Sequence, residues 1–142
     1  MSPGARHVKP IDVVAWVCVQ NARVLVTRTR GRDAYYLPGG KREPGESDWQ
    51  ALARETREEL AVELAPETIS LLGVIEAPAH AAPVGTQVRM ICYHADPVPT
   101  LPPLTARGEV EEIAWLDTRD RARCAPALQA VLIELNARGL IA

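Results

Sequence analysis

The sequence predicts an α/β or α+β fold in which helices cover both sides of a mixed sheet. Three observations support this fold class: a strand-like run at residues 11–19 that is apolar on both faces, a long amphipathic helix in the middle of the chain, and a second amphipathic helix near its end. Residues 1–142 are expected to form a single domain, because the chain contains no internal repeat and no linker.

The first part of the chain reads as strands joined by short turns. Residues 11–19 form the predicted covered strand, and residues 20–22 turn it into a second strand over 23–30, where valines alternate with Leu and Thr. A short strand at 34–37 then leads into a turn at 38–40.

The central helix is predicted to begin after Ser47, with Gln50 completing a capping box. It ends within residues 60–64, before Pro66, where a helix cannot continue. One stripe, at spacings i, i+3, i+4, i+7 and i+11, should face the core: Trp49, Leu52, Ala53, Thr56 and Leu60.

The second half is predicted to contain a hairpin, an irregular segment, a further strand and a closing helix. Its parts are strands at 69–76 and 87–95, a linking loop at 77–85 with a solvent-exposed His80, a proline-rich irregular segment at 96–108, a strand at 111–116, and a helix at 125–138 stopped by Gly139.

A cluster of acids lies on a second face of the central helix. Glu55, Glu58 and Glu59 occupy positions i, i+3 and i+4, so their carboxylates point in similar directions. As a merely solvated face they would be unfavourable, because each like-charged pair costs roughly 0.2–0.5 kcal/mol. Three oxygen donors on one rigid element instead suit a hard cation such as Mg²⁺.

Residues 40–62 resemble the signature box of the Nudix hydrolases, G-x5-E-x7-R-E-U-x-E-E-x-G-U, where U is a bulky aliphatic residue. Two positions depart from the pattern: Thr56 replaces an aliphatic residue, and Ala61 replaces the glycine near the helix end. If Ala61 is left-handed it is unfavourable by roughly 1 kcal/mol; otherwise the helix runs further. The matching residues are Gly40, Glu46, Arg54, Glu55, Glu58, Glu59 and Val62.

The resemblance implies an α/β/α sandwich around a mixed β-sheet and a Mg²⁺-dependent hydrolase, with Mn²⁺ as an alternative cation. Such enzymes cleave a nucleoside diphosphate linked to another moiety. A short chain with little beyond the box resembles the MutT-like branch, which converts nucleoside triphosphates to the monophosphate and pyrophosphate. Pro78, 16 residues after Val62, resembles instead a proline of ADP-ribose pyrophosphatases, so ADP-ribose or another nucleotide sugar is the alternative substrate.

A third alternative is a non-catalytic module of the same fold that binds a nucleotide. Such modules usually lose box carboxylates, because binding does not require an activated water. This chain retains all four, Glu46, Glu55, Glu58 and Glu59, which favours an enzyme.

The resemblance also assigns roles within the box. The metal would be bound by the Gly39 carbonyl and by the side chains of Glu58 and Glu59. Arg54 would pair with Glu46 and so brace the loop against the helix. Glu55 is the candidate general base and a further metal ligand.

Outside the box, Glu109 is the favoured additional metal ligand. For its neighbours Glu111 and Glu112 a charged edge strand is an equally good interpretation.

Cations and aromatic rings are expected to hold the substrate. Arg28 and Lys41 are the candidate phosphate ligands, with Arg30 as surface charge; Tyr35, Tyr36 and Trp115 are candidates for stacking on a base, and Trp16 and Trp49 for the core.

Composition limits the partners. Lys and Arg total 16 and Asp and Glu 18, for a net charge of −2 without a basic stripe, so a small nucleotide rather than a nucleic-acid polymer is the expected partner. Residues 1–10 have no apolar core, no segment is long enough to span a membrane, and Cys18, Cys92 and Cys124 read as free buried thiols, which together predict a cytoplasmic protein. Homodimers are common in the family, so a second copy is a further candidate partner.

Overall fold

The computed structural model describes residues 9–98 and 100–142. Two predictions reach outside the described residues. The absence of an apolar core concerns residues 1–10, and the irregular segment at 96–108 includes Pro99. The described chain forms seven strands, two α-helices and two 3₁₀ helices. Their bounds are β1 (Ile11–Trp16), β2 (Val19–Gln20), β3 (Arg23–Thr29), β4 (Gly39–Gly40), α1 (Asp48–Leu60), η1 (Pro66–Thr68), β5 (Ser70–Pro78), β6 (Gln87–His94), β7 (Val110–Leu116), η2 (Thr118–Arg123) and α2 (Pro126–Ala137).

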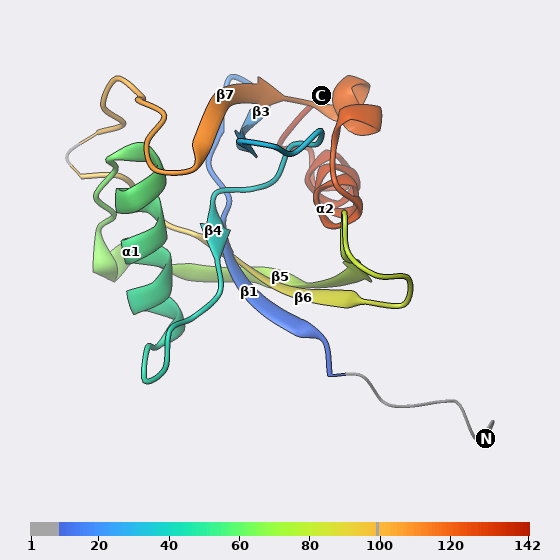
Figure 1. The fold of residues 1–142 in the computed structure, drawn as a ribbon. Helices are drawn as coiled ribbons and strands as arrows, with labels where there is room; N and C mark the ends of the chain where they lie inside the picture. Colours follow the sequence, from blue (N-terminus) through green and yellow to red (C-terminus); the bar gives the residue numbers. More distant parts are fainter. Residues whose placement is uncertain (1–8, 99) are drawn as a thin grey trace.

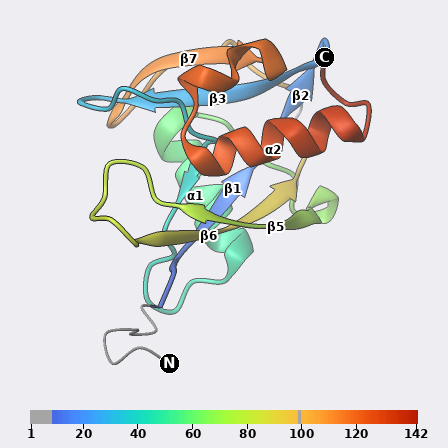
Figure 2. The same ribbon diagram turned by 90° about the vertical axis from the view of Figure 1, so that its right-hand side faces the viewer.

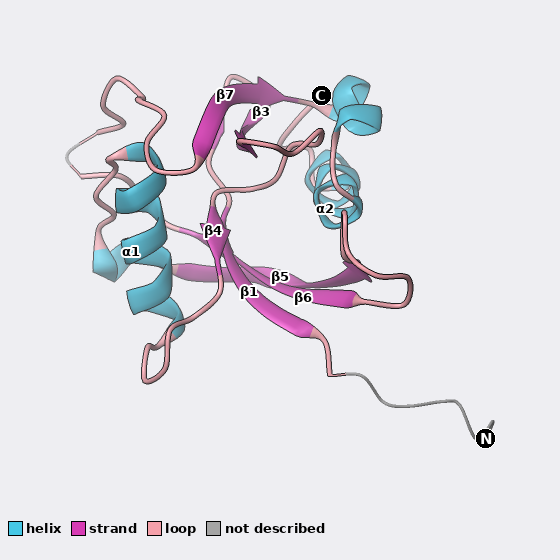
Figure 3. Ribbon diagram, viewed as in Figure 1, coloured by secondary structure: helices cyan, strands magenta, loops and turns pink. Residues whose placement is uncertain are grey.

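The strands form two sheets. One is mixed, in the order β4-β1-β6-β5, with β1 parallel to β6 and the other pairs antiparallel; the second is antiparallel, in the order β2-β3-β7. Helix α1 lies on one side of these sheets and α2 on the other (Figures 1 and 3). Figure 2 shows α2 between the β3–β7 pair and the β5–β6 hairpin. The predicted α/β class, with helices on both sides of mixed sheets, is confirmed.

The single strand predicted over 11–19 is wrong in one respect, because the chain changes sheets within it. Strand β1 ends at Trp16, and β2 begins at Val19 in the second sheet. The side chains of Trp16 and Cys18 nevertheless pack in the α1-side core, and those of Ala15 and Val17 in the α2-side core. Apolar residues on both faces therefore reflect two cores, and the alternation continues through the break.

The segment before α1 also differs from expectation. Residues 34–37 form no strand and make only isolated bridges through Tyr35 and Tyr36, whereas the predicted turn contains β4, a pair of residues bonded to β1. Gly39 has φ +149°, and a Cβ atom there would lie 2.0 Å from the carbonyl oxygen of Val14. Only glycine allows β4 to approach β1 this closely.

Helix α1 begins as predicted. The hydroxyl of Ser47 accepts a hydrogen bond from the Gln50 amide at 3.1 Å, and the Gln50 side chain accepts one from the Ser47 amide at 2.9 Å. The helix ends at Leu60, and Ala61 is left-handed at φ 56°. Thr56, at the departing position, is buried, and its hydroxyl donates to the Leu52 carbonyl at 3.0 Å.

The remaining elements follow the prediction closely. Strands β5 and β6 form the expected antiparallel hairpin, and β7 begins one residue early at Val110. The closing helix α2 buries Leu128, Val131, Leu132 and Leu135. The two 3₁₀ helices, η1 and η2, are not among the predicted elements. All three cysteines are buried and free. Across the described residues, no helix combines the length and apolarity that crossing a membrane requires.

Candidate active site

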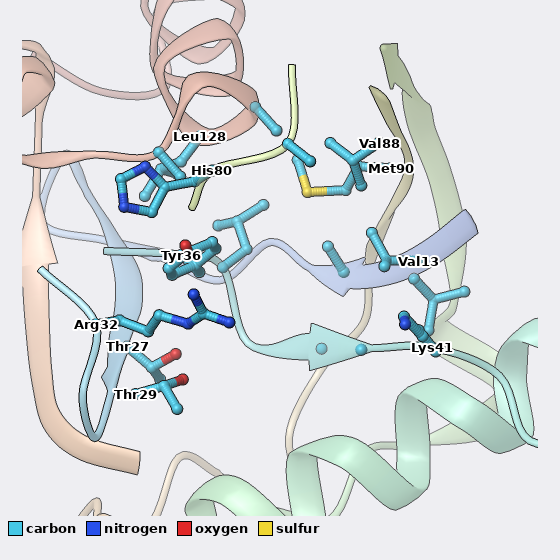
Figure 4. Close-up of a pocket in the computed structure, with 18 of the residues that line it drawn as sticks. Val13, Thr27, Thr29, Arg32, Tyr36, Lys41, His80, Val88, Met90 and Leu128 are labelled. Carbon is cyan, nitrogen blue, oxygen red and sulfur yellow. The ribbon is translucent and has the colours of Figure 1, made fainter. Parts of the chain in front are cut away.

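Residues from both sheets and both helices line a cavity of about 450 Å³ (Figure 4). Glu59 lines it from α1 and Glu109 from the turn before β7. Lys41 and Arg32 bring positive charge to the same cavity. The other walls are mainly apolar: Val13, Val14, Ala15, Tyr36, Leu37, Pro78, Val88, Met90, Ala127 and Leu128. The cavity therefore combines acids, cations and an apolar surface.

Arg54 joins the lead-in loop to α1. Its Nε and Nη2 atoms donate to the two carboxylate oxygens of Glu46 at 2.8 and 2.9 Å, which is the predicted pair. Its Nη1 atom donates to Glu55 at 3.0 Å and to Glu58 at 3.3 Å, and Nη2 also reaches the Lys41 carbonyl at 3.1 Å. One guanidinium thus holds three of the four box carboxylates and the backbone of the loop.

The two glycines of β4 lie against the carboxylates of Glu59 and Glu55. The Gly39 amide donates to Glu59 Oε1 at 2.8 Å. A Cβ atom on Gly40 would lie 2.6 Å from Oε1 of Glu55, so this carboxylate fills the space that a side chain would need. Glu58 differs from both, since its side chain is 58% exposed.

The pKa of Glu59 is raised to about 8, mainly by burial and in part by the charges of Glu55, Glu58 and Glu109, against the lowering effect of the Gly39 amide. Burial likewise raises the pKa of Glu55, although Arg54 opposes this. Both shifts have one physical cause: carboxylates gathered in a half-buried place with too little positive charge.

This donor set fits a divalent cation in its chemistry, because hard cations prefer carboxylate and carbonyl oxygens. Within residues 9–98 and 100–142, no three acidic, histidine or cysteine side chains are arranged as a ready-made metal site. Each of the three helix acids already has a hydrogen-bond partner, since Arg54 donates to Glu55 and Glu58 and the Gly39 amide donates to Glu59.

Glu109 is fixed by its backbone. The neighbouring Arg107 amide donates to the Glu59 carbonyl at 3.0 Å, and the Glu109 carbonyl accepts from the Arg30 amide at 2.8 Å. The turn is therefore tied to α1 on one side and to β3 on the other. Glu111 and Glu112 lie instead on β7, where both pair with Arg28, at 3.3 and 3.7 Å. For these two the charged-strand interpretation fits.

Of the five candidate substrate residues, Lys41 and Tyr36 line the cavity, and Arg28, Tyr35 and Trp115 do not. Arg28 is held by Glu111 and Glu112, and its Nη1 atom also donates to the Arg32 carbonyl at 3.2 Å. Tyr35 is buried, and its hydroxyl is bonded to Glu112. Arg28 lies away from the cavity because the chain turns after Thr29, which leaves the Arg28 side chain among the acids of β7.

Three cavity residues had no role, or a minor one, in the sequence prediction. No motif in the sequence includes Arg32, and Tyr36 is one of three candidates for stacking on a base. His80 was expected to be solvent-exposed, but its ring lies against Tyr36 with centroids 5.8 Å apart, and its Nε2 atom bonds to Asp33 at 2.7 Å. For Arg32 the sequence does contain one signal, Gly31, because a glycine there marks a turn that changes the direction of the side chains that follow.

Comparisons with known proteins agree with this fold. A family model described as the NUDIX domain matches residues 9–132. Comparison with curated proteins finds no match. A NUDIX hydrolase from Nitrosomonas europaea is 26% identical, with a TM-score of 0.70 over 94% of this chain and 92% of that chain. The ORF135 protein of E. coli is 27% identical, with a TM-score of 0.67 over 92% and 93%.

A MutT protein from Methanosarcina mazei Go1 has a TM-score of 0.73 over 95% of this chain and 99% of its own. At 18% identity this likeness concerns the fold alone. The family model, in contrast, spans most of the chain and contains the acidic box on α1. We therefore conclude that the protein belongs to the Nudix hydrolase family.

Proposed function

We propose that the protein is a divalent-cation-dependent hydrolase of a nucleoside diphosphate linked to another moiety. The favoured reaction is that of a MutT-like pyrophosphohydrolase, which converts a nucleoside triphosphate to the monophosphate and pyrophosphate. The observation that carries the proposal is the composition of one cavity. Glu59 and Glu109 line it together with Arg32 and Lys41, so carboxylates, which hard cations prefer as ligands, and positively charged side chains, which attract phosphates, face the same space.

The box acids are proposed to bind the cation, with Mg²⁺ expected. Glu55, Glu58 and Glu59 are the proposed side-chain ligands, and the Gly39 carbonyl completes the set. When bound, a divalent cation neutralises phosphate charge and lowers the pKa of a coordinated water. Arg54 keeps the loop docked on the helix, so the ligands stay together before the cation and the substrate arrive.

Glu55 is the proposed general base. A base works best when its pKa approaches the working pH, and burial raises the pKa of Glu55 in that direction. Glu109 is the alternative, because its turn is tied to α1 and β3 and it lines the cavity.

One observation favours a second substrate class. Pro78, the residue associated with ADP-ribose pyrophosphatases, lines the cavity at the end of β5. An ADP-ribose or nucleotide-sugar pyrophosphatase is therefore the second candidate. Both candidates require cleavage of a phosphoanhydride, so they share the same box chemistry and differ in the group beyond the phosphates.

The test is release of phosphate or pyrophosphate from nucleoside triphosphates, oxidised triphosphates, ADP-ribose, dinucleoside polyphosphates and sugar nucleotides, with Mg²⁺ or Mn²⁺. Glu59→Gln should abolish metal-dependent turnover. The matched control is Glu63→Gln, which removes an exposed carboxylate just beyond the same helix and should retain activity. An inactive parent that still binds nucleotide would favour the non-catalytic module instead.

A further inference from the structure

Most arginines in the described chain are paired with carboxylates, and Arg32 is an exception that lines the cavity. Arg54, Arg57 and Arg119 each lie within 2.7 to 2.8 Å of an acid. Within residues 9–98 and 100–142, Arg32 makes no salt bridge, yet it borders the space shared by Glu59 and Glu109. Four other arginines without an ion pair there do not line the cavity: Arg30, Arg89, Arg107 and Arg121.

The backbone around Arg32 is held in place by a tight turn. The Arg32 amide donates to the Thr29 carbonyl at 3.0 Å, and Gly31 within the turn has φ 82°, where glycine is preferred. The carbonyl of Arg32 accepts from Arg28 Nη1 at 3.2 Å. Arg28 is itself fixed by the β7 acids, so it acts as a brace for the residue that follows the turn.

The next residue is anchored from the other sheet. The Asp33 carboxylate is 2.7 Å from Nε2 of His80, which lies in the loop between β5 and β6. His80 in turn packs edge to face with Tyr36. Figure 4 shows the guanidinium of Arg32 extending below the Tyr36 ring toward β4. The charge of Arg32 also acts on the Tyr36 hydroxyl, lowering a pKa that burial raises.

We propose that Arg32 binds a phosphate group of the substrate, and that Arg28 and Asp33 are positioning residues that hold its turn. A guanidinium presents several donors in a plane and bonds phosphate oxygens in pairs, whereas Lys41 offers a single charged group. The ligand is an anionic phosphate lying between the acids of the cavity and the ring of Tyr36. The inference rests on the proposed function, because that function supplies the phosphate.

The experiment measures binding of inorganic pyrophosphate, with Mg²⁺ present, by isothermal titration calorimetry. Arg32→Gln should weaken binding about tenfold, the usual effect of losing a charge-assisted pair, and Arg32→Lys about threefold. The matched control is Arg30→Gln, two residues earlier and exposed, which should stay within about twofold of the parent. Arg28→Gln should weaken binding about threefold in the parent and have no effect in the Arg32→Gln background.

The outcomes separate this inference from the proposed function. Equal binding by Arg32→Gln and the parent, or an equal loss in Arg30→Gln, overturns the role of Arg32. Additive losses for Arg28 and Arg32 overturn the positioning role of Arg28. A parent that binds no pyrophosphate overturns the inference as a whole. A parent that binds pyrophosphate through Arg32 but hydrolyses no substrate refutes only the proposed reaction.

Discussion

Ala61→Gly should stabilise the protein, because Ala61 stands in a left-handed conformation at the end of α1. Its φ and ψ are 56° and 34°, and its amide donates to the Arg57 carbonyl at 3.1 Å, so the conformation is part of the helix end. Alanine in this region costs about 1–2 kcal/mol. Glycine offsets about 0.4–1 kcal/mol of this gain, because it increases the conformational entropy of the unfolded chain. The side chain is exposed, so no burial is lost.

The net gain is therefore about 0.8 kcal/mol, or about 2–4 °C in Tm for a chain of this size. Thermal melts by circular dichroism, supported by urea unfolding with an unchanged m-value, measure the gain. The control is Ala137→Gly, an exposed alanine in the last turn of α2, which should lose about 0.5–1 kcal/mol. If both substitutions lower Tm, the argument from the left-handed helix end is refuted.

Four further predictions follow from the site and its surroundings. Gly39→Ala should destabilise the fold by about 3 kcal/mol or more in urea unfolding, because its Cβ would overlap the Val14 carbonyl. Gly40→Ala should keep Tm near the parent value but lower turnover at least about tenfold, because only the flexible Glu55 carboxylate must move. Mg²⁺ at ten times its Kd should raise stability by about 1.4 kcal/mol, seen as a Tm increase that chelation reverses. Arg119 holds the pKa of Asp117 at about 2, so the stability that Asp117 contributes is present above pH 4 and is lost as the pH falls through 2. The Tm of Asp117→Asn should therefore differ from that of the parent at pH 7 and approach it near pH 2.

The helix and its acids were predictable because they depend on local spacing. Ser47 and Gln50 cap α1 within one turn of chain, and Arg54 reaches Glu46 only eight residues away. The sheet change after Trp16 was not predictable, because the apolar alternation passes through it without interruption. Arg32, and not Arg28, lines the cavity because of a turn and because acids of β7, more than 80 residues away in the chain, bind Arg28. Such long-range partners have no local pattern.

The charge balance of the box supports the proposed cation-dependent site over a surface that only binds a nucleotide. One guanidinium, that of Arg54, is shared by three carboxylates, and the bonded partner of Glu59 is an uncharged amide. Burying a carboxylate without a counter-charge is unfavourable, which is why the pKa of Glu59 rises to about 8. A surface that only bound phosphates would be weakened by these acids, since the ligand is itself an anion. A divalent cation held by these acids would remove this repulsion, and it would also supply the charge that favours hydrolysis of a phosphoanhydride.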